Sequence, residues 1–389
     1  MKTLLLENAN VILPNEKAEN VSLWITDGRI AEISKNGANL KPDEKTNLEG
    51  ATIFAGFIDI HIHGAIGVDI NNTSGEDLGK VSKYLASKGV TAWLPTLVPD
   101  SDLNYQKSID AVEEFMQLQK NEPIAQVVGV HYEGVFANEK MCGALRPAFF
   151  KNFKNSNEIK TLPKIKNKNA IHFTTLAPEI ENGIDLIKEL KKQNWIVSIG
   201  HTKADLETLE KAKQAGAKHL THFFNAMTGL HHRDLGVVGW GLTDEEITFD
   251  IIADGVHVHL KMLEFACRNK TSEKTILISD SVAPTGLGDG DFEIWGEKFS
   301  VANGKTRNER GSIAGSVITM LDAVKRMLSL GFSEVEVSKM ASANPARLLG
   351  IEKTHGSIEI GKRADLVALD ARGNVKLCLV AGNVAFSDI

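Results

Sequence analysis

The middle of the chain alternates between amphipathic segments and short apolar runs. Apolar residues at helical spacing predict helices, whereas short runs rich in valine and isoleucine predict buried strands. Because each predicted helix is followed directly by such a run, the pattern favours repeated strand–helix units and a parallel sheet. The helix and strand pairs are 76–88 with 89–94, 104–119 with 125–130, 184–192 with 195–200, 206–214 with 219–222, and 262–269 with 275–279.

The number of these units predicts an α/β fold of the (β/α)8 TIM-barrel type. A length of about 300 residues suits a barrel with insertions better than an open sheet. No glycine-rich nucleotide-binding fingerprint opens the predicted helices, which disfavours a doubly wound fold. Residues 151–169 are rich in lysine and asparagine. We interpret them as a solvated, partly helical insertion rather than a binding surface.

Both ends of the chain have a different texture, with short alternating strands separated by glycine-rich turns. Asp27 and Gly28, for example, mark a hairpin turn. We therefore predict a small β-sandwich domain built from residues 1–52 and 354–389, beside a metal-dependent barrel catalytic domain of residues 53–353. The predicted terminal strands are 4–13, 21–26, 29–34, 356–360, 364–369 and 375–381.

The amino-acid composition of the chain disfavours several classes of partner and cellular compartment. The chain has 389 residues, a hydrophobic share of 42% and a formal net charge of −6 without charged blocks. That balance disfavours nucleic acid and anionic membranes as partners, although it allows a local pocket for a phosphorylated small molecule. Cys142, Cys267 and Cys378 are widely spaced, which predicts a reducing compartment without a disulfide framework or a cysteine-based zinc site. With no signal-peptide pattern and no bilayer-length apolar run, we expect a cytoplasmic protein.

A predicted strand near the start of the barrel carries two histidines one residue apart. His61 and His63 lie in an apolar run that ends at Gly64. Side chains repeat with a period of two along a strand, so both imidazoles are expected on the same side. Two imidazoles on one face at the end of a buried strand are poised to bind a metal ion. Asp59 shares this face but lies deeper, and we expect it to orient a histidine.

Polar residues also close four other predicted strands at the equivalent position. The carboxyl ends of barrel strands meet at one face, where the loops carry the chemistry. Metal ligands have to converge from different strands, and a histidine or carboxylate at each strand end meets that need. The predicted metal ligands are His61, His63, Glu133, His201 and His222.

Asp280 ends the fifth of these strands and is the candidate general acid/base. A carboxylate beside a metal can take a proton from water and pass it to a leaving group. The alternative role is a turn cap helped by Ser281, but the register that Asp280 shares with the other strand ends favours catalysis. His131, close to Glu133, is interpreted as a structural, hydrogen-bonded residue instead.

Residues suited to substrate binding follow the strand that ends at His222 and one further strand. One loop contains Asn225 and Ala226, where backbone N–H groups could face an anion. Further along, Arg233 either grips a phosphate bidentately or pairs with Asp234 at the surface, and these residues alone do not separate the two roles. His257 ends another predicted strand and is expected to reach the substrate.

Together with their neighbours, these residues form recognisable motifs. The first motif resembles the signature of the amidohydrolase superfamily, and the others resemble the N-acetylglucosamine-6-phosphate deacetylase family within it. The similarity runs over nearly the whole chain, and its later motifs are much more specific than the first. The segments that carry it are 59–64, 131–134, 200–202, 221–227, 253–257, 279–284 and 311–316.

This resemblance implies removal of the acetyl group from N-acetylglucosamine 6-phosphate, giving glucosamine 6-phosphate and acetate in amino-sugar catabolism. It implies a homodimer in which part of the site comes across the interface. Zinc is the expected ion, one or two per subunit, while iron and other divalent ions also suit N/O ligation.

The resemblance also assigns roles to the candidate residues. Asp280 would be the acid/base. The implied ligands of the main metal are Glu133, His201 and His222, those of a second metal are His61 and His63, and the implied contacts of the sugar phosphate are Asn225, Ala226, Arg233 and His257.

Leu145 departs from the family pattern, because many members place a polar substrate-contacting residue there. This leaves the exact substrate open, with N-acetylgalactosamine 6-phosphate as an alternative, and Arg146 is a candidate replacement. A cyclic-amide hydrolase is disfavoured because the strand 171–176 carries no lysine for carbamylation and Glu133 is the natural substitute. A scaffold without catalytic activity is disfavoured because all the expected ligands are present.

Overall fold

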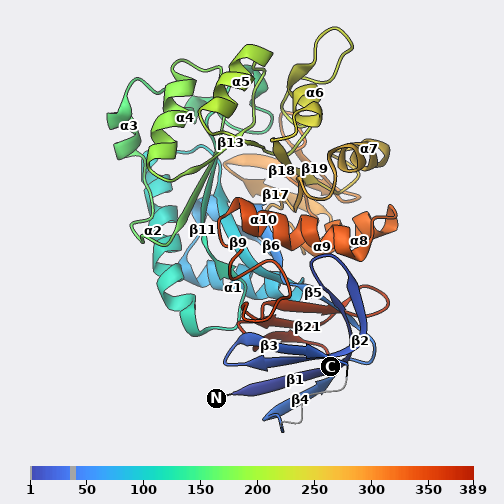
Figure 1. Ribbon diagram of the computed structural model, residues 1–389. Coiled ribbons are helices and arrows are strands. Elements are labelled where there is room, and N and C mark those ends of the chain that lie inside the picture. The colour runs from blue at the N-terminus through green and yellow to red at the C-terminus, as the bar shows by residue number, and fades with distance from the viewer. Residues whose placement is uncertain (1, 36–40) are drawn as a thin grey trace.

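A computed structural model describes residues 2–35 and 41–389. Met1 and residues 36–40, which fall inside the predicted small β domain, lie outside the described residues. The described part contains a parallel barrel surrounded by helices and, below it in Figure 1, a separate sheet built from both termini. The predicted fold class is thus confirmed, while the domain boundaries at 52/53 and 353/354 stay a prediction.

Eight parallel strands of the described chain form the barrel, and they pair in chain order. Residues on both faces of the first strands are buried, which explains their nearly continuous apolar character. The short strand β10 (Gln126–Val127) adds a second pairing to β9. The barrel strands are β6 (Phe57–Ile62), β9 (Val90–Leu97), β11 (Gly129–Phe136), β12 (Ile171–Leu176), β13 (Ile196–Ile199), β14 (His219–Leu220), β15 (Thr248–Ile252) and β16 (Thr275–Ile278).

Helices cover the outside of the barrel, and several of them begin at side-chain caps. Ser74, Ser101, Asp205 and Thr319 each accept a hydrogen bond from a backbone N–H of the first helical turn. The helix bounds agree with the predicted ones to within two residues where both exist. The helices are α1 (Gly75–Ser87), α2 (Asp102–Leu118), α3 (Ser156–Thr161), α4 (Gly183–Lys192), α5 (Leu206–Gln214), α6 (Gly236–Thr243), α7 (Leu260–Lys270), α8 (Met320–Ser329), α9 (Glu334–Ser338) and α10 (Asn344–Leu348).

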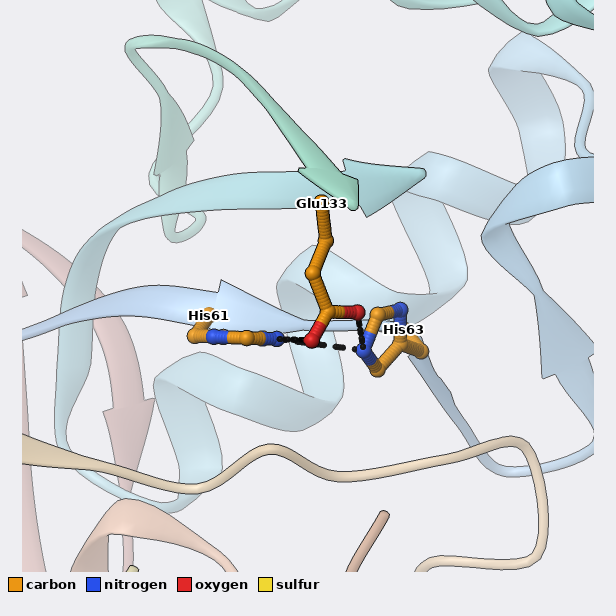
Figure 2. Close-up of side chains that lie close together, drawn as sticks. All are labelled: His61, His63 and Glu133. Carbon is orange, nitrogen blue, oxygen red and sulfur yellow. Dashed lines mark hydrogen bonds and ion pairs between the residues drawn. The ribbon is translucent and has the colours of Figure 1, made fainter. Parts of the chain in front are cut away.

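The barrel closes between its last and first strands at the rim that carries the candidate site. The N–H of Asp280 donates to the carbonyl of His61 at 2.9 Å, and the N–H of His63 donates to the carbonyl of Ser281 at 2.8 Å. Closure therefore fixes Asp280 beside His61 of β6 and His63 directly after it, and Figure 2 shows both histidines close to Glu133 of β11.

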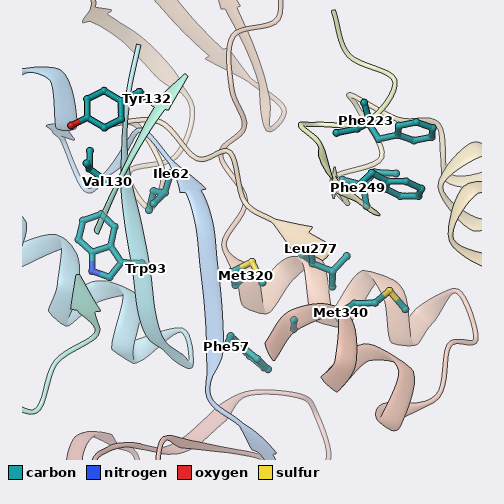
Figure 3. Close-up of a cluster of buried hydrophobic side chains, with 14 of the residues drawn as sticks. Phe57, Ile62, Trp93, Val130, Tyr132, Phe223, Phe249, Leu277, Met320 and Met340 are labelled. Carbon is teal, nitrogen blue, oxygen red and sulfur yellow. The ribbon is translucent and has the colours of Figure 1, made fainter. Parts of the chain in front are cut away.

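The main hydrophobic core lies between the barrel strands and the surrounding helices, as Figure 3 shows. Trp93 on β9 is fully buried, and its Nε1 donates to Ser82 of α1 at 3.1 Å. Phe223 and Phe249 stack at 4.2 Å between ring centroids. Burying one such side chain contributes about 1.5–3 kcal/mol. None of the helices in the described ranges combines the length and apolar character needed to cross a bilayer.

The terminal strands are hydrogen-bonded into one eight-stranded sheet within the described residues. Its side chains alternate as the period of two requires. Leu366 and Leu377 face the sheet's own core, whereas Val367 and Cys378 join the barrel core. The strands are β1 (Thr3–Ile12), β2 (Lys17–Thr26), β3 (Arg29–Ser34), β4 (Glu44–Asn47), β5 (Thr52–Ala55), β20 (Leu366–Leu369), β21 (Val375–Val380) and β22 (Asn383–Ser387).

The predicted strand at 356–360 is wrong, because this segment forms turns and bends instead. Gly356 adopts φ +86° and lies so close to α10 that a Cβ there would be 2.5 Å from the Cβ of Ala346. Ile358 is nevertheless buried in the core of the terminal sheet. The apolar residue that resembled part of a strand therefore anchors a loop.

A small antiparallel sheet between β16 and α8 was not predicted. Its strands are β17 (Gly290–Ile294), β18 (Glu297–Ala302) and β19 (Lys305–Asn308). They have their own small cluster of buried residues, which also includes Val282 just after Asp280. This insertion therefore packs directly beside the candidate site. A further short hairpin, β7 (Gly64–Ala65) with β8 (Val68–Asp69), follows the histidine pair.

Candidate active site

The five predicted metal ligands converge on one point. They form two groups that share Glu133, and the ligand atoms within each group lie within 4.8 Å of one another. The Oε1 atom of Glu133 is 3.1 Å from Nε2 of His201 and 3.0 Å from Nε2 of His222. Its other oxygen, Oε2, is 3.2 Å from Nε2 of His63. Glu133 therefore stands between the two groups, and Figure 2 shows it facing His61 and His63.

These distances fit divalent ions. The Nε2 atoms of His201 and His222 are only 3.1 Å apart, and those of His61 and His63 are 3.2 Å apart. Two neutral ring nitrogens that face each other with their lone pairs repel, unless a positive charge lies between them. Ligand atoms at about 2.1 Å from a tetrahedral zinc ion are about 3.4 Å apart, close to the observed separations.

Second hydrogen bonds set the tautomer of two of the histidines. The Nδ1 atom of His201 lies 2.9 Å from the carbonyl of Met141, and Nδ1 of His63 lies 3.2 Å from the carbonyl of Thr96. Because a carbonyl only accepts, each Nδ1 must carry the hydrogen. In the neutral form of each ring, the lone pair of the Nε2 atom then points into the site, as metal ligation requires.

Burial and neighbouring charges shift the pKa values of Glu133 and His63 in opposite directions. Burial raises the pKa of Glu133, but the surrounding histidines, His61 first, outweigh it and hold that pKa well below its usual value. Burial lowers the pKa of His63, but Asp280 and Glu133 outweigh it and raise that pKa to about 10. The two carboxylates thus draw positive charge into the site.

Three of the strand-end residues share an unusual backbone conformation. His201, His222 and Asp280 have φ values of +48°, +34° and +48°, in the left-handed region that residues other than glycine rarely adopt. Such conformations cost about 1–3 kcal/mol each and persist where the surrounding structure enforces them. Sequence analysis gave no sign of this turn, because none of the three residues is a glycine.

Asp280 is buried beside the histidine pair. Its Oδ1 atom is 3.4 Å from Nε2 of His61 and 3.2 Å from Nε2 of His63. Burial raises the pKa of Asp280, but these histidines outweigh it and hold the pKa below its usual value. An ionised carboxylate at this position is able to accept a proton.

The late motif 311–316 holds Asp280 in place. Ser316 donates its N–H to the carbonyl of Asp280 at 2.7 Å and its hydroxyl to the carbonyl of Ser279 at 2.5 Å. Gly315 has φ +60° and packs so closely that a Cβ there would lie 2.9 Å from the Asp280 oxygen and 2.5 Å from Val282. The glycine and serine of this motif therefore position the candidate acid/base.

We predict that Gly315→Ala lowers kcat about 100-fold, because a shift of about 1 Å at a catalytic group can cost that much. Gly304→Ala is the matched control, since Gly304 has a similar φ of +69° but nothing within 4 Å of its Cβ position. Steady-state kinetics and metal content of both variants would check this. Equal losses of kcat in the two variants would contradict the positioning role.

Two deeper residues bind the backbone and neighbouring hydroxyl groups. Among the described residues, Asp59 bonds no histidine ring, contrary to the prediction that it orients one. It accepts hydrogen bonds from the hydroxyl of Ser279 at 2.5 Å and from the backbone N–H of His61 at 3.4 Å, so it ties β16 to β6. Burial raises the pKa of Asp59 to about 6. His131 lies 2.8 Å from the hydroxyl of Thr175, and burial holds its pKa well below the usual value.

A cavity of about 170 Å³ opens onto the two ligand groups. Asn225, Ala226 and His257 line it, as the sequence predicted for substrate contacts. His257 is fixed by Asp254, with 2.7 Å between Nδ1 and Oδ2. Arg233 is not brought to this cavity, since it lies in an exposed surface loop.

Sequence analysis missed part of the cavity wall. Trp295, in the turn of the unpredicted hairpin, lines the cavity, and so does Ile313, which belongs to the motif 311–316 but had no role assigned to it. Leu145 also lines it. Arg146 does not replace the polar contact that Leu145 lacks, because its side chain forms an ion pair with Asp100 at 3.0 Å. Trp295 and Gly296 both have positive φ in this hairpin turn, and a tryptophan at the first of these positions is not among the residues that usually mark such a turn.

Comparison with known proteins places this site in a family. The amidohydrolase family matches residues 52–385, which include the barrel and every ligand described above. The chain belongs to the amidohydrolase family. The superfamily resemblance seen in the sequence is thereby confirmed, and the His and Glu cluster of this amidohydrolase is a site for divalent metal.

Similar proteins narrow the position of this amidohydrolase within the family. It is 33% identical over 398 residues to N-acetylglucosamine-6-phosphate deacetylase of Bacillus subtilis, covering 99% of this chain and 98% of that protein. It is 35% identical over 364 residues to N-acetylgalactosamine-6-phosphate deacetylase of Escherichia coli O157:H7, covering 93% and 94%. The crystal structure of N-acetylglucosamine-6-phosphate deacetylase from Thermotoga maritima matches with a TM-score of 0.88, 30% identity and coverage of 99% and 100%.

Proposed function

We propose that this amidohydrolase removes the acetyl group from N-acetylglucosamine 6-phosphate, giving glucosamine 6-phosphate and acetate. The observation that carries the proposal is the convergence of two histidine pairs on Glu133, with Asp280 beside one pair. The relatives that match over nearly the whole chain support the same reaction. The proposed catalytic residue is Asp280, and the proposed metal ligands are Glu133, His201, His222, His61 and His63.

A bound divalent ion would supply Lewis acidity, which lowers the pKa of water and polarises the acetyl carbonyl. The residues of the chain handle the proton. Asp280 accepts a proton from the attacking water as the new C–O bond forms. It then donates that proton to the amine nitrogen as the C–N bond breaks. One water is consumed, and acetate and the free amino sugar leave. We propose zinc as the ion, because nitrogen and carboxylate ligands at these separations suit it.

The sugar phosphate end of the substrate requires polar contacts. We propose that Asn225, Ala226 and His257 contact the sugar, since they line the cavity beside the ligands. We propose Arg233 as the phosphate contact. Its exposure in a surface loop fits a contact made across a homodimer interface. We further propose a cytoplasmic location, which agrees with the three free cysteines.

A second candidate substrate is N-acetylgalactosamine 6-phosphate, because a deacetylase of that sugar is 35% identical to this chain. The test is acetate release from four compounds, namely both N-acetylhexosamine 6-phosphates and their unphosphorylated forms. We expect the highest kcat/KM for N-acetylglucosamine 6-phosphate and a loss of at least about 100-fold without phosphate, since lost charged contacts cost several kcal/mol. A higher kcat/KM for the galacto sugar would favour the second candidate, and equal rates without phosphate would contradict a phosphate contact.

A further inference from the structure

The wall of the active-site cavity contains both polar and apolar side chains. Asn225 and His257 contribute polar groups to it, and Leu145, Trp295 and Ile313 contribute apolar groups. A hexosamine carries hydroxyl groups that need hydrogen-bond partners, while the alkyl part of an N-acyl group needs none. The cavity therefore offers both kinds of contact that an N-acylated sugar needs.

Leu145 contacts the backbone next to a metal ligand. A Cβ added to Gly134 would lie 2.2 Å from Cδ1 of Leu145, so the leucine side chain lies directly against the residue after Glu133. Leu145 is only 3% exposed and forms a small cluster with Val98 and Ala137, against which Trp295 also packs. Its position is thus set by packing on one side and by the ligand strand on the other.

Trp295 is fixed from three directions. It occupies the turn between β17 and β18 with φ +56°, and its ring meets that of His63 edge to face at 5.4 Å between centroids. The indole Nε1 donates to Asp69 at 3.2 Å. Its carbonyl accepts a hydrogen bond from Arg146 at 2.9 Å, and Arg146 is itself paired with Asp100. The indole therefore forms a rigid part of the cavity wall rather than a mobile side chain.

We infer that Trp295 and Leu145 form the acyl-binding wall of this enzyme and limit its substrates to a short N-acyl group. This inference rests on the proposed function. The reacting carbonyl carbon has to reach Asp280 and the ligand cluster, and the alkyl carbon of the acyl group is one bond away from it. Two large apolar side chains of the cavity wall lie against ligands or their neighbours, namely Trp295 against His63 and Leu145 against Gly134, the residue after Glu133.

The test compares N-acetyl and N-propionyl forms of the same amino-sugar phosphate. In the wild type, the additional methylene should lower kcat/KM, because a filled apolar pocket discriminates about 10- to 200-fold per methylene. In Trp295→Ala and, independently, in Leu145→Ala, the ratio of propionyl to acetyl kcat/KM should rise at least about 10-fold. A ratio of two substrates on one enzyme sample does not depend on how much of that sample is folded.

Phe292→Ala is the matched control, because Phe292 packs in the same insertion on β17 but does not line the cavity. Its propionyl-to-acetyl ratio should equal that of the wild type. Unchanged ratios in both Trp295→Ala and Leu145→Ala would overturn the inference. Failure of the wild type to release acetate would instead contradict the proposed function, so the two failures are distinguishable.

Discussion

Asp280→Asn is expected to lower kcat about 1000-fold while the protein keeps its fold and its metal. General acid–base catalysis contributes about 100- to 10 000-fold, and an amide in place of the carboxylate can neither accept nor return the proton. Asparagine has nearly the same shape, and two backbone hydrogen bonds, from the Asp280 N–H to His61 and from the Ser316 N–H to the Asp280 carbonyl, do not involve the side chain. The measurement is single-turnover and steady-state acetate release, with metal content determined on the same sample.

The metal content of the Asp280→Asn variant distinguishes a proton-transfer role of Asp280 from a metal-binding role. Its Oδ1 atom lies close enough to His61 and His63 to take part in metal binding as well. If Asp280 acts through the proton, the variant loses turnover but retains metal and substrate binding. Robust turnover in Asp280→Asn would contradict the assigned role, and loss of one ion together with turnover would make Asp280 chiefly a ligand.

Glu133→Gln is expected to abolish metal binding at both ligand groups and all measurable turnover. Glu133 is the one residue common to both ligand groups found among the described residues, and its oxygens face three histidines within 3.2 Å. An amide has no negative charge to offset a cation in this buried site. Removing a group that only hydrogen-bonds to a metal ligand lowers metal affinity about 10- to 100-fold. Removing the shared ligand itself should therefore lower it further. Metal analysis after gel filtration would measure it.

His61→Ala is the natural comparison, because His61 belongs to only one of the two groups. We expect this variant to lose one ion and retain the other at the group of His201 and His222. Its thermal stability should fall less than that of Glu133→Gln, because a bound ion stabilises the folded state. Equal metal loss in the two variants would contradict the division into two groups around Glu133.

Much of the scaffold could be predicted from local patterns. The helix at 206–214 and the strands at 171–176 and 29–34 appear in the structure with the bounds that the sequence indicated. These segments have strong hydrophobic periodicity, and the barrel buries the face that this periodicity defines. The strand predicted at 356–360 failed because apolar alternation alone does not distinguish a strand from a loop anchored by one buried isoleucine.

Part of the site could also be predicted from local periodicity. Side-chain alternation put His61 and His63 on one face, and the parallel arrangement brought the other strand ends to the same rim. Asp59 was assigned to the wrong partner, because its hydrogen bond to Ser279 joins residues 220 positions apart. Trp295 was missed because it lies on an inserted hairpin whose place over the barrel has no local signal.

The sequence by itself determined which residue types stand at the ends of the strands, and hence the barrel and its candidate metal ligands. Only the tertiary structure decided that Glu133 is shared by two ligand groups, and that left-handed turns aim His201, His222 and Asp280 inward. Hydrophobic periodicity indicates only which face of one segment is buried and which face is exposed to water. The direction of a strained side chain instead depends on hydrogen bonds such as that from Ser316, and these exist only once the barrel has closed.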